Sequence, residues 1–280
     1  MTRSELDEPR LSRRHAAGAG SARGLLFTVL GEFVLPSGRA VWTSTLIDVL
    51  GRLGVEEKAT RQALMRTAED GWLRAERHGR RTRWQLTTDA EQLLTDGTRR
   101  IYSFRAVMPD WDGRIVLVLA RVPETDRATR HRLSTRLGWA GFGSPVPGTW
   151  LSTHTERVAE VEQLLEQAGV GDARIFVAEH VGGADLTSMV RQAWDLDLVE
   201  ARYRDFLAEF AGSGPAEPLV RLVELVHAWR RFPFVDPALP RELLPRRWSG
   251  ERAATLFGKQ HAKWAANAVA EWAQLEPDAV

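Results

Sequence analysis

Residues 43–86 constrain the fold most strongly, because the apolar spacing changes there from helical to strand-like. Apolar side chains recur at helical spacing over 44–53 and again over 56–69, and Gly54 lies between these stretches. Asp70 and Gly71 follow the second stretch, and two strand-like runs then flank residues 78–80. This pattern predicts two helices joined by a short turn and followed by a β-hairpin. We expect Thr43 or Ser44 to cap the first of these helices.

The second predicted helix has two different faces. Positions 60, 63, 64 and 67 hold small or apolar residues that suit packing against other helices. The opposite face carries polar and cationic side chains: Lys58, Arg61, Gln62, Met65 and Arg66. A helix fits the DNA major groove, where Gln62 can pair with adenine and Arg61 or Arg66 with guanine. Taken alone, this face fits DNA contact and an ordinary solvated helix surface equally well, and the segment that follows it favours DNA contact.

The predicted hairpin is rich in arginine. Five arginines crowd into it: Arg74, Arg77, Arg80, Arg81 and Arg83. Because like charges at this density repel one another, we expect a bound anion to compensate them. Arg80, Arg81 and Arg83 are the candidates for contact with phosphates or with the minor groove. The helices and the hairpin together have the sequence pattern of a winged helix-turn-helix.

The charge of the chain is unevenly distributed. Residues 1–105 carry 18 Lys and Arg against 13 Asp and Glu, whereas the remainder carries 20 against 24. This asymmetry indicates a polyanionic partner for the N-terminal part. The chain has no cysteine, no apolar run of the roughly 18 residues that a membrane span needs, and no apolar secretion signal. These features favour a cytoplasmic protein without disulfides.

The rest of the chain divides into segments of different pattern. Residues 1–20 lack periodicity and are predicted to be a disordered tail. Residues 21–106 are predicted as the winged helix-turn-helix domain, in which Ser21 caps the first helix and Thr87 or Thr88 a later one. Strands and helices alternate over 107–183 in the βαββαβ order of a ferredoxin-like domain. Residues 184–280 are predicted to be a helical C-terminal domain, with helices near 185–211, 215–232 and 249–275. The predicted fold class is α+β.

Short motifs in this order resemble the PaaX family of bacterial transcriptional repressors over residues 21–275. They include Ser21-Ala22-Arg23, Asp70-Gly71-Trp72-Leu73, Gly141-Phe142-Gly143, Pro147-Gly148-Thr149-Trp150 and Phe234-Val235-Asp236-Pro237. The resemblance implies a Cas2-like central domain and a homodimer that binds double-stranded promoter DNA. It also implies repression of an aromatic-catabolism operon of the phenylacetate-degradation type, relieved by an aryl-acyl-CoA such as phenylacetyl-CoA.

An aryl thioester effector requires apolar walls and a few polar groups. The candidates for this role lie in the central and C-terminal parts: Trp139, Phe142, Trp150, Trp229, Arg230 and His261.

Two alternative functions remain open from the sequence. A Cas2-like domain suggests a metal-dependent nuclease, but the predicted strand over 113–122 has no carboxylate at its end, and we expect Asp112 to shape a turn. The other alternative is a DNA-binding protein without a small-molecule effector. The histidines lack metal-ligand spacing and no nucleophile motif is present, so we expect no catalytic residue, metal or cofactor.

Overall fold

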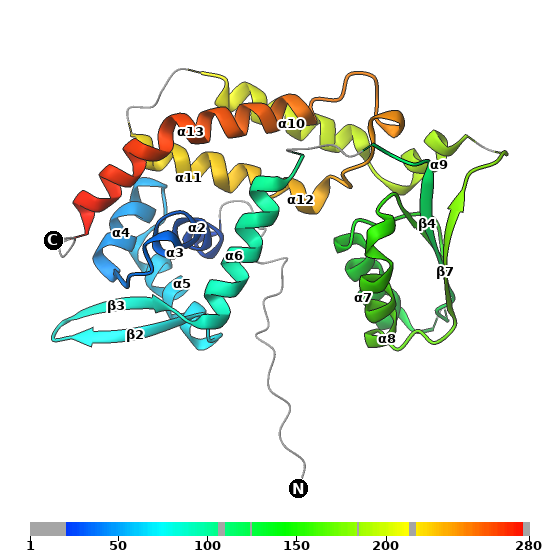
Figure 1. Cartoon of the computed structure of the whole chain (residues 1–280). Coiled ribbons are helices and arrows are strands. Elements are labelled where there is room, and N and C mark those ends of the chain that lie inside the picture. The colour runs from blue at the N-terminus through cyan, green and yellow to red at the C-terminus, as the bar shows by residue number, and fades with distance from the viewer. Residues whose placement is uncertain (1–20, 106–109, 124, 184, 213–216, 277–280) are drawn as a thin grey trace, which may run out of the picture. The chain divides into compact units, whose positions relative to one another are not determined.

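The computed structural model describes residues 21–105, 110–123, 125–183, 185–212 and 217–276. These residues form helices and two antiparallel sheets, which group into two compact units (Figure 1). The first unit takes in the described parts of Met1–Phe104, Ala208–Arg231 and Ala254–Val280, and the second those of Arg105–Leu207 and Phe232–Ala253. The predicted tail, residues 1–20, and the predicted boundary after residue 106 lie outside the described residues.

The first unit begins with the helix that the sequence predicted. The side chain of Ser21 accepts a hydrogen bond from Gly24 N at 3.0 Å and caps α2 (Ala22–Val29). The helix continues through a π-helical turn (Leu30–Val34) into α3 (Leu35–Ser37). Gly38, with a φ of 62°, then ends it, because a left-handed residue cannot continue a right-handed helix.

The predicted helix pair and hairpin follow. The pair consists of α4 (Thr43–Arg52) and α5 (Glu57–Glu69). The hairpin consists of β2 (Leu73–His78) and β3 (Arg81–Leu86), and the short strand β1 (Val41–Trp42) pairs with β3. All three strands are antiparallel in the order β1-β3-β2. The hairpin projects away from the helices of this unit (Figure 1).

The prediction that Thr43 or Ser44 caps α4 is wrong. Trp42 occupies the cap position without a capping side chain, and Thr43 is the first helical residue. The Thr43 hydroxyl instead donates to Thr82 O at 3.0 Å and accepts from Trp84 Nε1 at 2.9 Å. This threonine therefore ties the start of α4 to β3, a long-range contact that outweighs its local capping preference.

Three further helices complete the first unit. Thr87 caps α6 (Thr88–Ser103), as predicted, and α11 (Pro218–Trp229) and most of α13 (Gly250–Leu275) come from the C-terminal part. Ring stacking joins elements that are distant in sequence: Trp229 stacks on Phe257 with centroids 4.9 Å apart, and Phe33 on Trp272 at 4.8 Å. The core of this unit is thus built from both ends of the chain.

The second unit contains the predicted βαββαβ order. Its elements are β4 (Arg114–Ala120), α7 (Arg127–Trp139), β5 (Gly143–Val146), β6 (Thr149–Ser152), α8 (Val158–Gln167) and β7 (Ala173–Glu179). The sheet is antiparallel in the order β5-β6-β4-β7, which leaves β7 at an edge. Val118 pairs with Trp150 and Ile175, and the core beside it includes Leu133 and Val161 of the two helices. These helices therefore cover one face of the sheet.

The predicted helix over 185–211 is two helices, α9 (Leu186–Ala193) and α10 (Leu196–Phe210). Trp194 is extended between them, and its ring leaves no room for a Cβ at Gly143, which would lie 2.5 Å away. The Asp195 side chain then accepts from Leu198 N at 3.0 Å, as a capping residue does. Packing of one tryptophan against a glycine of β5 thus interrupts a continuous helical pattern.

A buried ion pair joins distant parts of the second unit. Arg105 donates to both carboxylate oxygens of Asp236 at 2.5 and 2.7 Å, and both side chains are fully buried. Tyr203 also donates to this carboxylate. Burial alone would lower the pKa of the Arg105 guanidinium, but the hydrogen bonds and charge of Asp236 raise it overall. The remaining short helices are α12 (Phe232–Val235) and two 3-10 turns (Thr155–Arg157 and Arg241–Leu243).

Candidate nucleic-acid interface

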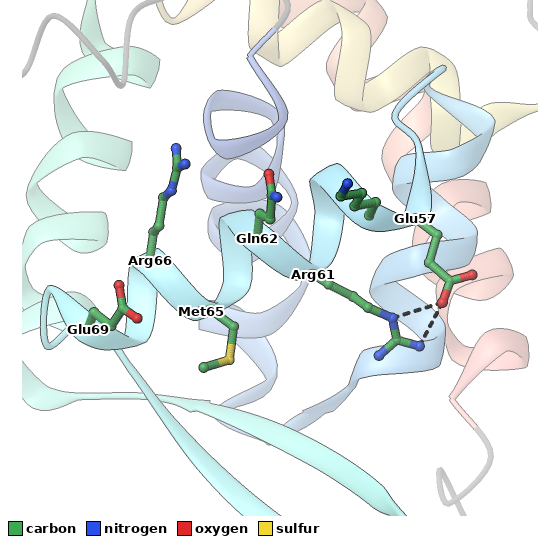
Figure 2. A pocket seen from close by; sticks show the side chains of 7 residues that line it. Glu57, Arg61, Gln62, Met65, Arg66 and Glu69 are labelled. Atoms are coloured by element: carbon green, nitrogen blue, oxygen red, sulfur yellow. Dashed lines mark hydrogen bonds and ion pairs between the residues drawn. The ribbon is translucent and has the colours of Figure 1, made fainter.

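Helix α5 has the two faces that the sequence predicted. Thr60, Ala63, Leu64 and Thr67 are buried in the first unit, and Thr60, Leu64 and Thr67 are completely inaccessible. The opposite face is exposed and lines an open depression of about 640 Å³ (Figure 2). Its residues are Glu57, Lys58, Arg61, Gln62, Met65, Arg66 and Glu69. The five residues of α5 predicted to bind DNA therefore lie together on one accessible surface.

Met65 is unusual on this surface because its side chain is apolar. It is 53% exposed, although a methionine at helical spacing usually belongs to a core. An exposed apolar side chain between cations is suited to an apolar contact in the major groove, such as a thymine methyl group.

The two arginines of α5 are in different electrostatic situations. Arg61 donates from Nε and Nη2 to Glu57 Oε1, at 2.8 and 2.7 Å, and the side chains are 58% and 59% exposed (Figure 2). Lys58 and Arg66, by contrast, form no ion pair within the described part of the chain. On this face Arg61 is therefore partly neutralised by Glu57, whereas Lys58 and Arg66 on either side of it keep their full charge.

The arginines of the hairpin also fall into two groups. Arg81 and Arg83 place their guanidinium groups 3.8 and 4.5 Å from the ring centroid of Trp42. Arg83 additionally lies opposite Glu76 across the strand pair. A cation over an indole ring and a carboxylate opposite it are both favourable. The protein itself therefore compensates part of the positive charge for which we expected a bound anion.

The other hairpin arginines have no such compensation. Arg74, Arg77 and Arg80 are exposed, and none of them is ion-paired among the residues that the structure describes. Arg80 lies in the turn itself, beside Gly79, whose φ is 62°. Uncompensated positive charge thus lies at the tip of the hairpin, on Arg77 and Arg80, and at its base, on Arg74.

Sequence reasoning missed the contacts of three residues that shape this surface. Trp42 lies beneath two arginines, Glu57 holds Arg61, and Thr43 links α4 to the hairpin. The Glu57–Arg61 pair had a visible signal, since acid and base four residues apart on a helix are neighbours. The contacts of Trp42 and Thr43 had none, because they depend on the pairing of β1 with β3.

The effector candidates of the central segment belong mainly to the core of the second unit. Phe142 and Trp150 are only 3% and 8% exposed and pack in the cluster between the sheet and its two helices. Trp139, at the end of α7, is partly exposed.

The C-terminal candidates belong to the first unit. Trp229 is buried and donates from Nε1 to Ile101 O at 3.0 Å. Arg230 donates from Nη1 to Gly24 O at 2.8 Å and to Thr28 Oγ1 at 2.9 Å, and burial with the nearby charge of Arg231 lowers its pKa to about 10. These two residues connect α11 to its neighbours within the core.

His261 is part of a hydrogen-bonded group. Its Nε2 lies 2.7 Å from Tyr102 Oη and 3.1 Å from Glu32 Oε2, and Tyr102 donates to Glu32 Oε1 at 2.7 Å. Burial, followed by the charge of Glu32, raises the pKa of the Tyr102 hydroxyl. The six effector candidates therefore lie in two separate units, three in each.

Asp112 has the role that was expected of it. Its carboxylate accepts from Arg114 N at 3.0 Å and pairs with the Arg114 side chain, forming a turn before β4. The hydrogen bonds from Arg114 lower the pKa of this carboxyl. Across the described residues, no three His, Asp or Glu side chains form a group that could hold a metal ion. None of the described helices is long and apolar enough to span a membrane.

Comparison with known proteins agrees with this architecture. The family models for PaaX-like protein, for the PaaX protein central Cas2-like domain and for the PaaX-like protein C-terminal domain match residues 21–90, 108–190 and 194–274. The chain is 31% identical over 263 residues to the Transcriptional repressor PaaX of Escherichia coli (strain K12), covering 87% of this chain and 81% of the relative. The chain belongs to the PaaX family, and its central domain is Cas2-like.

A solved structure shares the fold. An uncharacterized protein from Mycobacterium tuberculosis matches 90% of this chain and 98% of its own, with a TM-score of 0.60 and 22% identity.

Proposed function

We propose that this protein is a sequence-specific, DNA-binding transcriptional repressor whose first unit carries a winged helix-turn-helix. The observation that carries the proposal is the single exposed surface on which α5 gathers Lys58, Arg61, Gln62, Met65 and Arg66. The curated relative from Escherichia coli is named a transcriptional repressor, which supports the same class.

In this proposal α5 enters the major groove and the hairpin contacts the DNA backbone. Gln62 is suited to adenine, and Arg61 and Arg66 to guanine, because an amide and a guanidinium form bidentate pairs with these bases. Lys58 contributes charge at the start of the helix. Arg80, Arg81 and Arg83 contact phosphates or the minor groove, where positive charge gives affinity without sequence readout.

The protein acts as a homodimer, and β7 is the element best suited to the interface. Phe176 and Val177 are 45% and 46% exposed on this edge strand. An apolar strand at a sheet edge presents free backbone groups and tends to pair with another chain. A two-fold dimer would place two copies of α5 in major grooves about 34 Å apart on a partly palindromic operator.

An aryl-acyl-CoA, such as phenylacetyl-CoA, releases the repressor from an aromatic-catabolism operon. Such a ligand acts if it binds better to a conformation that does not fit the operator, because only differential affinity shifts a population. Trp139, Phe142, Trp150, Trp229, Arg230 and His261 remain the proposed contacts, in one or the other unit. A rise in melting temperature with phenylacetyl-CoA, but not with CoA alone, would support this effector.

The test of the function is selection of bound duplexes from a random pool, followed by titration of the enriched sequence by fluorescence anisotropy. We expect one enriched half-site motif, arranged as an inverted repeat, and a loss of at least about tenfold in its affinity for Arg61→Ala or Arg66→Ala. Binding without any enriched motif would contradict the proposal.

The same duplexes test the nuclease alternative. Incubation with Mn²⁺, and with a chelator as control, is expected to leave the labelled strands intact. Cleavage that requires the metal would establish an enzymatic activity instead.

A further inference from the structure

We infer that Glu57 is a specificity-determining residue of this DNA-binding surface, which it controls by orienting the Arg61 guanidinium toward guanine. The inference rests on the proposed DNA-binding function. It adds that Arg61 and Arg66 contribute differently to DNA binding, because Glu57 orients only Arg61.

The geometry of the pair leaves one edge of the guanidinium available. Glu57 Oε1 accepts from Nε and Nη2 of Arg61, which together form the side edge of the group. A guanidinium has five N–H donors in a fixed plane, so the end edge, formed by Nη1 and the second N–H of Nη2, remains free. That edge has the spacing required for the O6 and N7 acceptors of guanine. Figure 2 shows Arg61 turned along the exposed face toward Glu57.

The exposure of the pair argues against a structural role. Both side chains are more than half exposed and four residues apart on one helix, an arrangement that contributes little to folding. The ion pair does, however, restrict the rotamers of Arg61 before DNA arrives, which reduces the entropy lost on binding.

The charge of Glu57 explains why the pair would favour a specific sequence. A carboxylate at a DNA-facing position repels phosphates, and it partly neutralises the one arginine beside it. On a non-cognate duplex this repulsion has no compensation. On a cognate duplex the bidentate contact between Arg61 and guanine compensates it. Arg66, which has no ion pair within the described residues, keeps its full positive charge and attracts any duplex in addition to its proposed contact with guanine.

Glu69 provides a matched control. It lies at the other end of α5 and lines the same exposed surface, but within the described residues it holds no arginine. Glu57→Gln and Glu69→Gln therefore remove the same charge from the same face, and only the former releases Arg61. Because both positions are exposed, both variants are expected to fold. Their melting temperatures should shift only slightly, down for Glu57→Gln in the first turn of α5 and up for Glu69→Gln at its last residue.

The experiment uses the full-length protein and the duplex enriched by the wild type, with each guanine of the half-site replaced in turn by 7-deazaguanine, which lacks the N7 acceptor. Affinities are measured at about 50 and about 200 mM salt. The guanine that Arg61 contacts is identified with the Arg61→Ala variant. At that position, and at no other, replacement by 7-deazaguanine no longer lowers the affinity of this variant. Discrimination is the ratio of the affinities for guanine and for 7-deazaguanine at that position. We expect this ratio to fall about tenfold in Glu57→Gln and to be unchanged in Glu69→Gln. Both variants should bind non-specific DNA more tightly.

A double variant separates action through Arg61 from direct contact. In the Arg61→Ala background, the additional change Glu57→Gln should have no effect on base discrimination. The inference is overturned if Glu57→Gln discriminates between the two bases as well as Glu69→Gln does. It is also overturned if Glu57→Gln changes the preference at a cytosine when Arg61 is absent, because Glu57 would then contact that base directly. If the wild type enriches no sequence at all, the proposed function itself fails, and this inference fails with it.

Discussion

At the scale of single residues, the arginines of the hairpin are not equivalent. Arg80 is an exposed turn residue, whereas Arg81 covers the ring of Trp42, which is only 4% exposed. A long cationic side chain can therefore bind an anion and shield an aromatic ring at the same time. This distinction separates effects on DNA affinity from effects on stability.

We predict that Arg80→Ala weakens binding to every duplex and reduces the slope of log affinity against log salt by about one, without changing stability. Arg81→Ala should weaken binding similarly and also lower the free energy of unfolding by about 0.5–1 kcal/mol, because the contact with Trp42 is lost. Anisotropy titrations at several salt concentrations and urea unfolding measure the two effects. Equal stability of the two variants would show that the stacking contributes nothing.

The two threonines of the buried face of α5 provide a second prediction. Thr67 donates to Ala63 O at 2.6 Å, whereas Thr60 Oγ1 is buried and has no hydrogen-bond partner among the described residues. Because a buried unsatisfied hydroxyl is costly and valine has nearly the same shape, Thr60→Val should raise the free energy of unfolding by about 1 kcal/mol. Thr67→Val, the matched control, should not stabilise the protein. A destabilised Thr60→Val in urea unfolding would indicate a partner for this hydroxyl.

At the scale of elements, the packing of α11 on α2 depends on a neutral histidine. His227 Nδ1 lies 3.0 Å from Thr28 Oγ1. Burial, with further contributions from Arg230 and Arg231, lowers the pKa of His227 from 6.5 to about 4. Protonation in the folded state would therefore place a third positive charge beside two arginines.

This shift predicts how stability depends on pH. Because the pKa of His227 is lower in the folded state, the unfolded chain binds more protons between about pH 6.5 and about pH 4. The contribution of His227 to the free energy of unfolding is therefore lost as the pH falls through that window. The pKa difference between the unfolded and folded states corresponds to a total loss of about 3 kcal/mol in the free energy of unfolding. The difference in unfolding free energy between wild type and His227→Gln, measured from pH 7 to pH 4.5, isolates this contribution from that of the carboxylates. Parallel curves for the two proteins would contradict the prediction.

Elements also show what local sequence can predict. The faces of α5 and the caps Ser21 and Thr87 follow from periodicity and short-range hydrogen bonding, and the structure confirms them. The break at Trp194 could not be predicted, because it depends on a glycine of β5 about fifty residues away, beside which the ring fits. The polar exposed face of α5 was predictable, but the pairing state of each arginine was only partly so.

At the scale of the whole molecule, the proposed dimer through β7 leads to a prediction about assembly. Phe176→Asp places a charge on the exposed edge strand and should convert the dimer to a monomer, because an interface cannot bury an unpaired carboxylate without cost. Loss of the second recognition helix should then weaken binding to the inverted repeat by at least about a hundredfold. Sedimentation velocity and anisotropy titration measure these outcomes.

The control for this prediction is His131→Asp, which introduces the same side chain at an exposed position of α7. It should leave both the mass and the affinity unchanged. A dimeric Phe176→Asp variant would place the interface on another surface of the protein.

The amino-acid sequence alone determined most of the order of helices and strands, β1 and the break at Trp194 excepted. It also determined the two faces of α5 and the concentration of arginine in the hairpin, because these properties depend on residues within a few positions of one another. The three-dimensional structure decided which of these positive charges are left to interact with an external anion. Glu57 holds Arg61, Trp42 lies beneath Arg81 and Arg83, and Lys58, Arg66 and Arg80 lie without an ion pair in the described part of the protein. It also decided that Phe142, Trp150 and Trp229 belong to cores. Apart from the Glu57–Arg61 pair, whose members are four residues apart on one helix, these contacts join segments that are distant in the chain, and local pattern carries no record of them.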